Sequence, residues 1–506
     1  MKKAQSTGNK YKRGMSTLEI LIAFAILILC ISAVIMVVFG NQSIAVDSET
    51  NNEAISKAQR IVEIARAKSR EDFNSVNTES LPDEDIYHLD QEVTDLTQCK
   101  KEIIGTVSWD IGGRTLSVDF STFLSDIAGA LMMGGDCTID PPGTDWSNPQ
   151  RYTSADIIPG GNEGTDIDAM KIDGHKYAFL TSVHNSVASD DFWVFDVEVG
   201  FEVEPPTVGQ LDVGAGLNAI DVARDINSGE IYAYVLENDN VNQLKVIKVT
   251  DPGIPTLIAS ASRTLPNMNH TCSPPVSPCL AGQSIYFYDG YIYIGTDYIQ
   301  NLVAPPFQNN ELHVYCVSNI SVPGCSPSNP IWLGSYNVNH NVNSITIVDK
   351  TAYLATSWDD QELTILNVEE ADNISPLDDF EAIGDEDGTS VTILGNKIYV
   401  GRKQTASSRP ELYILEKSDL SVKKEIDLNL SPADASVADI VVVSRFIFLG
   451  TGDSNAEFQV WNSDDLTSRW SDFDFPQAIT GLEFLDDKIY AAVKSNDALH
   501  IIYDEP

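Results

Sequence analysis

The chain has 506 residues, of which 43% are hydrophobic and 21% are charged. This composition excludes wholesale disorder, and the length exceeds that of a single ordinary core. The 74 acidic and 32 basic residues give a formal net charge of −42 at pH 7. Such a charge repels phosphate backbones, so it argues against nucleic acid as a partner and favours cations and basic proteins.

The chain begins with a basic segment that leads into a strongly apolar one. Ile20 opens a run of twenty residues, interrupted only by Ser32, that ends at Phe39. A helix of this length spans about 30 Å, the thickness of the hydrocarbon core of a membrane. The basic residues before it predict a cytoplasmic N-terminus and an exported remainder. A cleaved secretory signal fits poorly because Val38, Phe39 and Gly40 do not form a small-x-small cleavage site, whereas a plain membrane anchor remains an alternative.

The residues at the start of this run carry a more specific pattern. A basic stretch is followed by Gly14, Met15 and, at the edge of the apolar run, Glu19. The pattern resembles the type IV prepilin class III signal, in which a basic leader ends in glycine and a glutamate occupies mature position five. The resemblance implies that residues 1–14 are a leader, that prepilin peptidase cuts between Gly14 and Met15, and that Met15 is methylated. It also implies that Glu19 pairs with the N-terminal amine of a neighbouring pilin subunit, because a carboxylate in apolar surroundings needs a cation.

Two departures favour a minor pilin or pseudopilin over a major pilin. Mature position one is Met15, where phenylalanine is commoner, and the proline that many major pilins carry in mid-helix is absent. Small apolar residues recur at three- and four-residue spacing as far as Ala65, which predicts that the helix continues beyond the membrane. We expect one helix over residues 15–73, ending before the polar stretch that leads to Pro82.

Residues 74–145 are expected to form a small α+β pilin-like head. Residues 102–110 and 114–120 alternate apolar and polar side chains on either side of a short glycine-containing turn, which predicts a β-hairpin. This hairpin resembles the one in the heads of minor pilins and pseudopilins. A proline- and glycine-rich stretch at residues 140–145 is typical of a linker.

Residues 146–506 contain seven copies of one pattern: a strand, a tight turn, a second strand with an aromatic residue, a polar loop and a third apolar strand. The second-strand aromatics recur every 42 to 61 residues. They are Tyr177, Tyr232, Tyr293, Tyr353, Tyr399, Phe448 and Tyr490. Seven such repeats predict a seven-bladed β-propeller rather than a β-sandwich. The last copy lacks a fourth strand, so we expect residues 150–158 to pair with it and close the ring.

Some of these repeats carry a further resemblance. Residues 244–262 resemble the LVIVD-type repeat of bacterial surface and secreted propellers, and residues 312–337 resemble the same unit with an insertion. The resemblance extends over about residues 150–506. It supports the propeller fold and does not identify a ligand.

Seven cysteines are present, of which Cys30 lies in the apolar run. The other six allow fifteen connectivities. We expect sequential pairing because two of the pairs bracket proline-rich insertions and because an exported chain meets an oxidising compartment; buried free thiols are the alternative. The predicted bridges are Cys99–Cys137, Cys272–Cys279 and Cys316–Cys325.

The sequence contains no recognisable catalytic constellation. The seven histidines are scattered, and neither a His-Glu-x-x-His nor a Gly-x-Ser-x-Gly motif occurs. Acid-rich loops remain as candidates, because carboxylates gathered on one face of a propeller are ligands for calcium. The alternative is a solvated acidic surface, which we favour because no complete EF-hand spacing is present. The residues predicted to hold calcium are Asp359, Asp360, Glu362, Asp385 and Asp387.

Taken in chain order, these patterns predict a fold class and a function. The fold class is a long N-terminal α-helix with a small α+β pilin head, followed by an all-β seven-bladed propeller. The expected function is that of a non-enzymatic minor type IV pilin at a filament tip, displaying the propeller for adhesion or partner recognition. It would pass from the cytoplasmic membrane to the outside of the cell. The alternatives are a tethered propeller enzyme of the glycosidase or lyase type, and a secretion-system pseudopilin that recruits cargo.

Overall fold

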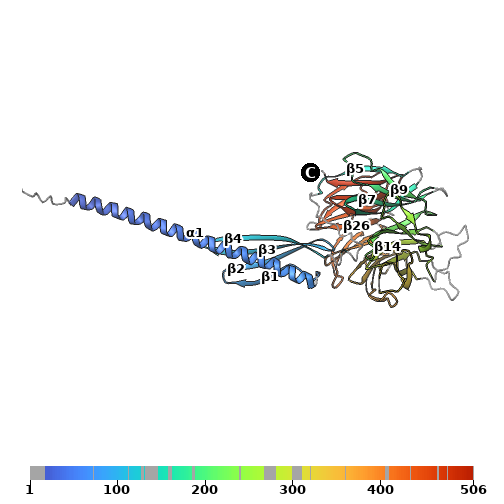
Figure 1. Cartoon of the computed structure of the whole chain (residues 1–506), viewed down its shortest axis with the longest axis horizontal. Helices are drawn as coiled ribbons and strands as arrows, with labels where there is room; N and C mark the ends of the chain where they lie inside the picture. Colours follow the sequence, from blue (N-terminus) through green and yellow to red (C-terminus); the bar gives the residue numbers. More distant parts are fainter. Residues whose placement is uncertain are drawn as a thin grey trace, which may run out of the picture. The chain divides into compact units, whose positions relative to one another are not determined.

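A computed structural model describes residues 17–71, 73–111, 113–126, 130, 146–157, 162–184, 189–238, 241–266, 281–298, 310–319, 321–358, 360–404, 409–432, 435–463, 466–475 and 477–504. Figure 1 shows its elements in chain order. The chain forms two compact units. The N-terminal unit comprises residues 1–93 and 103–122, and the C-terminal unit comprises residues 94–102 and 123–506.

The N-terminal unit combines one helix with most of one antiparallel sheet. The helix α1 spans Thr17–Glu71, and the sheet has the strand order β1-β2-β3-β4. The strands are β1 (Glu79–Glu84), β2 (Tyr87–Thr97), β3 (Lys100–Ile111) and β4 (Arg114–Ser125). The predicted hairpin is confirmed, since β3 and β4 are neighbours in this sheet.

The C-terminal part of α1 packs on one face of this sheet. Ala54, Ala58 and Ile61 lie four and three residues apart on α1 and are buried against Tyr87 and Trp109 of the strands. Small residues on both sides allow the close approach: a Cβ added to Gly105 on β3 would lie 3.0 Å from the carbonyl oxygen of Ala58. The helix therefore serves as the cover for the apolar face of the sheet.

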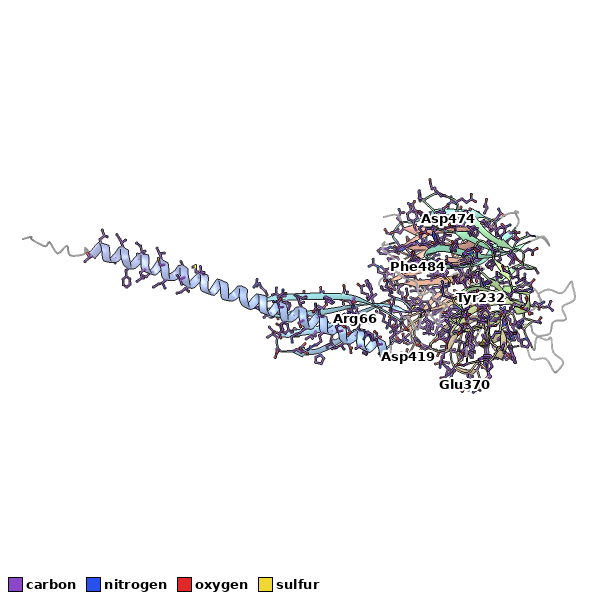
Figure 2. The ribbon with its side chains drawn as sticks, in the orientation of Figure 1. Arg66, Tyr232, Glu370, Asp419, Asp474 and Phe484 are labelled. Atoms are coloured by element: carbon purple, nitrogen blue, oxygen red, sulfur yellow. A yellow bond between two sulfur atoms is a disulfide. The ribbon has the colours of Figure 1, made fainter. Side chains whose placement is uncertain are left out.

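The N-terminal part of α1 differs sharply from this buried part. Its described side chains are exposed, and in Figure 2 they project away from the helix with no other described segment of this unit over them. The large apolar residues among them are Leu18, Leu21, Ile22, Phe24, Ile26, Leu27, Ile28, Leu29, Ile31, Val34, Ile35, Met36 and Val37. Within the described stretches of the chain, no helix is both long enough and apolar enough to cross a membrane.

The predicted fold class is wrong as a description of the chain. Among the described residues the bounded helical elements are α1 and one 3₁₀ turn, η1 (Ala259–Ala261), and helix makes up about 11% of the residues, whereas eight four-stranded antiparallel sheets dominate. The elements bounded in the described part of residues 74–145 are all strands, so this part of the expected α+β head is a β-sheet. The physical reason is that α1 itself packs on the apolar face of this sheet, so that face needs no further helix to cover it.

The C-terminal unit contains, within its described residues, seven four-stranded antiparallel sheets, each a simple meander except the last. The first four are β6–β9 (Asn162–Ile172, His175–His184, Phe192–Asp196, Thr207–Leu211), β10–β13 (Leu217–Arg224, Ile231–Glu237, Leu244–Lys248, Thr256–Leu257), β14–β17 (Gly282–Tyr288, Tyr291–Thr296, Leu312–Cys316, Ile331–Tyr336) and β18–β21 (Val342–Val348, Thr351–Thr356, Leu363–Asn367, Ser375–Phe380). The others are β22–β25 (Gly388–Leu394, Lys397–Arg402, Leu412–Glu416, Val422–Ile426), β26–β29 (Val437–Val443, Phe446–Thr451, Phe458–Asn462, Ser471–Phe473) and β30–β32 (Ile479–Leu485, Lys488–Val493, Asp497–Asp504) with β5 (Pro149–Asp156).

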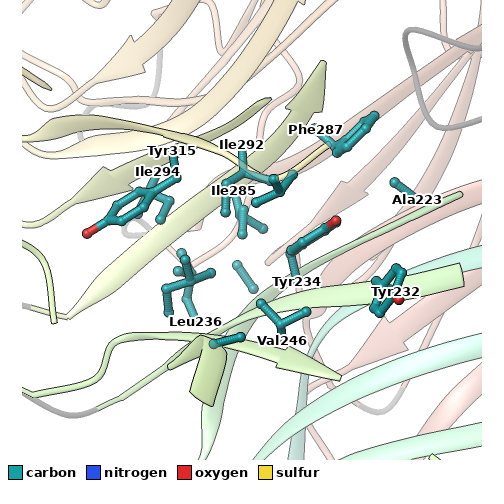
Figure 3. Close-up of a cluster of buried hydrophobic side chains, with 14 of the residues drawn as sticks. Ala223, Tyr232, Tyr234, Leu236, Val246, Ile285, Phe287, Ile292, Ile294 and Tyr315 are labelled. Atoms are coloured by element: carbon teal, nitrogen blue, oxygen red, sulfur yellow. The ribbon is translucent and has the colours of Figure 1, made fainter. Parts of the chain in front are cut away.

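These seven sheets form a closed, propeller-like ring. The first strand of each sheet contacts the first strand of the next, and β30 contacts β6 to complete the circle. An apolar layer fills each junction between neighbouring sheets. In the layer of Figure 3, Tyr234 and Leu236 of one sheet pack with Ile285 and Phe287 of the next, and the rings of Tyr234 and Phe287 stack at 5.9 Å. Burial on both faces explains the nearly continuous apolar runs in the second and third strands.

The ring closes where the beginning and the end of the unit meet. The pairing predicted for residues 150–158 is confirmed, because β5 pairs antiparallel with β32 as the outermost strand of the last sheet. A loop between β8 and β9, which we call the clasp (residues 197–206), holds this strand from the neighbouring sheet. The Tyr152 hydroxyl donates to the carbonyl of Val199 at 3.0 Å, and the amide of Glu202 donates to the carbonyl of Tyr152 at 3.0 Å.

Candidate functional site

A central cavity of about 430 Å³ lies between the first strands of all seven sheets. Its wall is largely polar, and it includes Asp166, Asp168, Asp221 and Asp439 as well as Gln98 from the N-terminal side of the chain. A cavity of this size, with several carboxylates facing it, is the natural first place to look for a binding or catalytic site. The hydrogen-bond partners of these carboxylates indicate whether the carboxylates serve a ligand or stabilise the ring.

Each of the four aspartates ties its own sheet to a neighbour. Asp166 accepts a hydrogen bond from the backbone amide of Ile220 at 2.9 Å, and Asp168 accepts one from Val222 at 2.5 Å. In the same way, Asp221 accepts from Phe287 at 2.6 Å and Asp439 accepts from Leu482 at 2.8 Å. These side chains occupy donors that the first strands would otherwise leave unpaired around the channel.

Burial makes these carboxyl groups weak acids. It raises the pKa of Asp439 to about 6 and that of Asp168 to about 7. Burial, with the nearby charge of Asp168, raises the pKa of Asp221 to about 8. Burial also raises the pKa of Asp166 well above its usual value. Partial protonation near neutral pH lowers the repulsion among the four groups.

A second set of ties lies at the start of the first strands. In every sheet the register of the first strand shifts at its beginning, so that one residue forms a β-bulge. In five sheets the side chain of that bulged residue donates to a backbone carbonyl at or near the start of the first strand of the next sheet. These bonds run from Thr165 to Leu217, Asn218 to Gly282, Asn343 to Gly388, Thr389 to Val437 and Thr480 to Gly164. The polar positions of the first strands are therefore parts of the ring itself.

The alternation of strand direction gives the ring two distinct faces. The turns between first and second strands lie on one face, the turn face. The loops between second and third strands, together with the connections between sheets, lie on the other, the loop face. Ser444 and Gly395 belong to turns of the turn face, whereas Tyr298 and Trp358 belong to loops of the loop face.

The turn face is occupied by residues 94–102, the tip of the β2–β3 hairpin, which we call the plug. The amide of Ser444 donates to the carbonyl of Leu96 at 2.9 Å, and the Gln98 side-chain amide donates to the carbonyl of Ile393 at 3.2 Å. Asp95 lies beside Gly395, where an added Cβ would come within 2.2 Å of its carboxylate. The plug, through Thr97 and Gln98, forms part of the wall of the cavity on this face.

Acidic residues directly before the third strands form another repeated device. Asp191, Glu311, Glu362, Glu411 and Glu457 precede β8, β16, β20, β24 and β28, and all five are buried. Each accepts a hydrogen bond from a backbone amide just after the fourth strand of its own sheet, from Val213, Val338, Ala382, Leu428 and Phe475 respectively, at 2.7–2.8 Å. Burial raises the pKa of Glu311, Glu411 and Glu457 to about 7. These five acidic residues therefore hold parts of their own sheets together and do not form an acidic surface.

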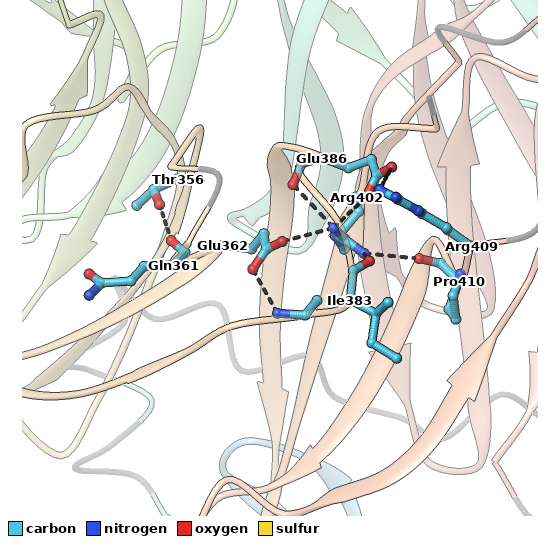
Figure 4. Close-up of polar contacts among 9 residues, drawn as sticks. Thr356, Gln361, Glu362, Ile383, Glu386, Arg402, Arg409 and Pro410 are labelled. Carbon is cyan, nitrogen blue, oxygen red and sulfur yellow. Dashed lines mark hydrogen bonds and ion pairs between the residues drawn. The ribbon is translucent and has the colours of Figure 1, made fainter. Parts of the chain in front are cut away.

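One member of this set lies in a buried ionic network between two sheets (Figure 4). Arg402 at the end of β23 lies 2.8 Å from the carboxylate of Glu362 and 2.9 Å from that of Glu386, and all three side chains are at most 1% exposed. Arg409 reaches the second carboxylate oxygen of Glu386 at 2.6 Å. Two cations therefore balance two carboxylates; Arg402, Glu362 and Glu386 are buried, whereas Arg409 is partly exposed.

Four of the five residues predicted to hold calcium are described, and no group of potential metal ligands occurs among the described residues. Glu362 points into the buried network and is neutralised by Arg402, which makes it unsuitable as a calcium ligand. Asp360 and Asp385 are exposed, Asp387 is partly buried, and Asp359 lies outside the described residues. Sequence reasoning did not single out Arg402, because its partners Glu362 and Glu386 lie in separate segments that only the fold brings together.

The other predicted site residues are placed as follows. The Cys316–Cys325 bridge is confirmed, with Cα atoms 5.8 Å apart. Cys99 is disulfide-bonded, but its predicted partner Cys137 and both members of the predicted Cys272–Cys279 bridge lie outside the described residues. The same holds for Gly14 and Met15, while Glu19 lies in α1 with a side chain that is not described.

Comparisons with known proteins identify no family. No protein-family profile matches the chain, and no curated protein matches it. Among solved structures, the computationally designed Ika8 protein is similar with a TM-score of 0.42 and 11% identity, covering 70% of this chain and 99% of its own. The computationally designed Ika4 protein has a TM-score of 0.25 and 13% identity, covering 33% and 91% respectively.

Proposed function

We propose that this chain is a minor pilin-like protein that displays the propeller-like ring outside the cell for adhesion or partner recognition. In this proposal the N-terminal helix holds the protein in the cytoplasmic membrane first and in a filament of pilin subunits afterwards. The ring is then a recognition module. It has no catalytic part in the proposal, because the four aspartates facing its cavity accept hydrogen bonds from backbone amides of neighbouring sheets.

The observation that carries the proposal is the division of α1 into two parts. The part with Ala54, Ala58 and Ile61 is buried within its own unit, whereas the part from Leu18 to Val37 exposes its large apolar side chains, with Met36 76% exposed. Thirteen such residues on one helix far exceed the scattered apolar exposure of an ordinary surface, so they call for an external partner. Lipid and the helices of neighbouring subunits both supply an apolar environment.

The leader pattern favours neighbouring pilin subunits as the partner. Gly14, Met15 and Glu19 stand at the positions of the type IV prepilin signal, directly before the exposed apolar stretch. A plain anchor needs neither a cleavable glycine nor an acid at the edge of the apolar run. The acid has a role only where assembly supplies a cation, here the N-terminal amine of a neighbouring subunit.

The test is the identity of the mature N-terminus. Expressed with a prepilin peptidase, the wild-type chain should yield a protein that begins at a methylated Met15. Gly14→Val should remain uncleaved, because the peptidase needs a small residue there. Gly8→Val, a change of the same kind within the leader, should still be cleaved and serves as the control. A mature N-terminus at any other residue would contradict the proposal.

A further inference from the structure

Three aromatic rings form a column on the loop face of the ring. The rings of Tyr298 and His340 are 5.6 Å apart and 26° from parallel, and those of His340 and Trp358 are 4.8 Å apart and 13° from parallel. They come from three different segments: the loop after β15, the connection before β18 and the loop after β19. His340 is in the middle, so Tyr298 and Trp358 each have one ring face that the column does not cover.

This column is separate from the packing that builds the fold. All three residues are partly exposed, and none belongs to the apolar layer between the sheets β14–β17 and β18–β21. Most other aromatic rings of the C-terminal unit are buried in such layers. The column is therefore not needed to fill the core.

Polar contacts around Asn341 hold the rings in place. The Asn341 side chain accepts a hydrogen bond from the amide of Tyr298 at 2.7 Å. The backbone of Asn341 exchanges two hydrogen bonds with Ser357: its amide donates to the Ser357 hydroxyl at 3.1 Å, and its carbonyl accepts from the Ser357 amide at 3.2 Å. The three segments that carry the rings are thus joined directly, which lowers the entropic cost of presenting them to a ligand.

The arrangement selects one ligand chemistry. Parallel rings in a column extend naturally by one more flat group, whereas a cage for an alkylammonium ion needs rings on several sides. A nucleobase is flat, but the phosphates attached to it are repelled by a chain with a net charge of −42. The apolar C–H face of a neutral sugar ring meets neither objection. Asp360, exposed two residues beyond Trp358, supplies a carboxylate that accepts hydrogen bonds from hydroxyl groups.

We propose that the column of Tyr298, His340 and Trp358 is a carbohydrate-binding site that stacks on the apolar face of a neutral pyranose ring. The biological role of this site rests on the proposed display function. The column lies on the loop face, opposite the plug. The site gives the recognition module a defined class of target, a glycan on a cell or a polysaccharide surface.

The test uses the full-length protein, purified in detergent, on a printed panel of neutral, N-acetylated and acidic oligosaccharides. The wild-type protein should bind members of the neutral or N-acetylated classes. In titration with the best of these, Trp358→Ala should weaken binding at least tenfold. Trp470→Ala is the matched control: this tryptophan is 42% exposed and lies between β28 and β29, away from the column, so its loss should leave binding unchanged.

Three results would overturn the site. They are a wild-type protein that binds no member of the panel, preference for acidic members alone, and equal weakening by the two alanine variants. If Trp358→Ala does not fold, Trp358→Phe keeps a ring and should bind with an intermediate affinity; unchanged affinity would count against the site. The binding test on detergent-purified protein requires neither cleavage of the leader nor assembly of a filament. A negative result would therefore overturn the carbohydrate site without contradicting the proposed N-terminal processing.

Discussion

Arg402 and Glu362 meet across the junction of two neighbouring sheets, with Nη2 and Oε1 2.8 Å apart and both side chains fully buried. Glu362 also accepts a hydrogen bond from the amide of Ala382, which follows the outer strand of its own sheet. A single carboxylate therefore links the outer edge of one sheet to the second strand of the next. Buried pairs of this kind contribute little when compared with apolar packing, but they are costly to break, because the remaining charge has no partner.

The first prediction follows from that asymmetry. Glu362→Gln should destabilise the C-terminal unit by up to about 3–5 kcal/mol, because Arg402 and Arg409 then share the single carboxylate of Glu386 and the network carries an excess positive charge. Glu369→Gln is the control: Glu369 pairs with Lys350 at 3.3 Å, both are more than half exposed, and its loss should cost under about 1 kcal/mol. Urea unfolding followed by near-ultraviolet circular dichroism measures both. Similar midpoints for the two variants would show that the network does not brace the junction.

The second prediction concerns pH. Burial raises the pKa of Glu311, Glu411 and Glu457 to about 7 in the folded chain, whereas an unfolded glutamate titrates near 4.3. The folded state therefore holds more protons between these values, and this contribution to stability is fully present below about pH 4.3 and is lost as the pH rises through 7. The melting temperature should be higher at pH 5 than at pH 8 by at least about 3 °C.

General charge repulsion acts in the same direction, so a variant must separate the two effects. Glu411→Gln keeps an acceptor for the amide of Leu428 but cannot ionise, and it should reduce the pH dependence measurably. Glu370→Gln removes the same charge at an exposed position outside this set of buried acids, and it should leave the pH dependence almost unchanged. Equal slopes for the two variants would assign the effect to overall charge alone.

The third prediction tests the plug. Gly395 has a φ of +60°, and a Cβ at this position would lie 2.2 Å from the carboxylate of Asp95. Gly395→Ala should therefore cost more than the roughly 1 kcal/mol expected for a left-handed backbone alone, and it should increase hydrogen exchange in residues 94–102. Gly174→Ala, in the equivalent turn of the first sheet, has a φ of +88° and nothing within 4 Å of the added Cβ, so exchange in the plug should not change.

The fourth prediction concerns the clasp. Phe201 lies 5.6 Å from the ring of Tyr152 on β5 and 5.8 Å from that of Tyr503 on β32, although it is half exposed. Phe201→Ala should lower the free energy of unfolding by about 1 kcal/mol. It should also increase the rate of hydrogen exchange in β5 more than in any other outer strand of the ring. Phe123→Ala, at a comparably exposed phenylalanine in another sheet, provides the comparison. Uniform exchange across the outer strands would show that the clasp does not guard the closing strand.

Sequence periodicity was sufficient to predict the repeated strands and the pairing of the closing strand, because alternating and continuous apolar runs report burial directly. It was not sufficient for the head, where the covering helix comes from the preceding segment. It also misassigned Glu362, since a carboxylate in a loop reads as solvated until its partner Arg402, forty residues away, is known. A usable signal was present: an acid immediately before the third strand recurs at Asp191, Glu311, Glu411 and Glu457, and solvation alone gives no reason for that register.

The pairing of β5 with β32 has a consequence for how the protein is made. Trp146 and Asp504, whose amide and carboxylate are 2.8 Å apart beside this closure, are separated by 358 positions in the chain. While the ribosome is still adding the intervening sheets, β5 has no partner and exposes an open edge. Closure therefore comes last, after β32 has emerged and, in an exported protein, after it has crossed the membrane. Residues 149–156 are therefore the segment that a chaperone would have to shield from incorrect strand pairing during that interval.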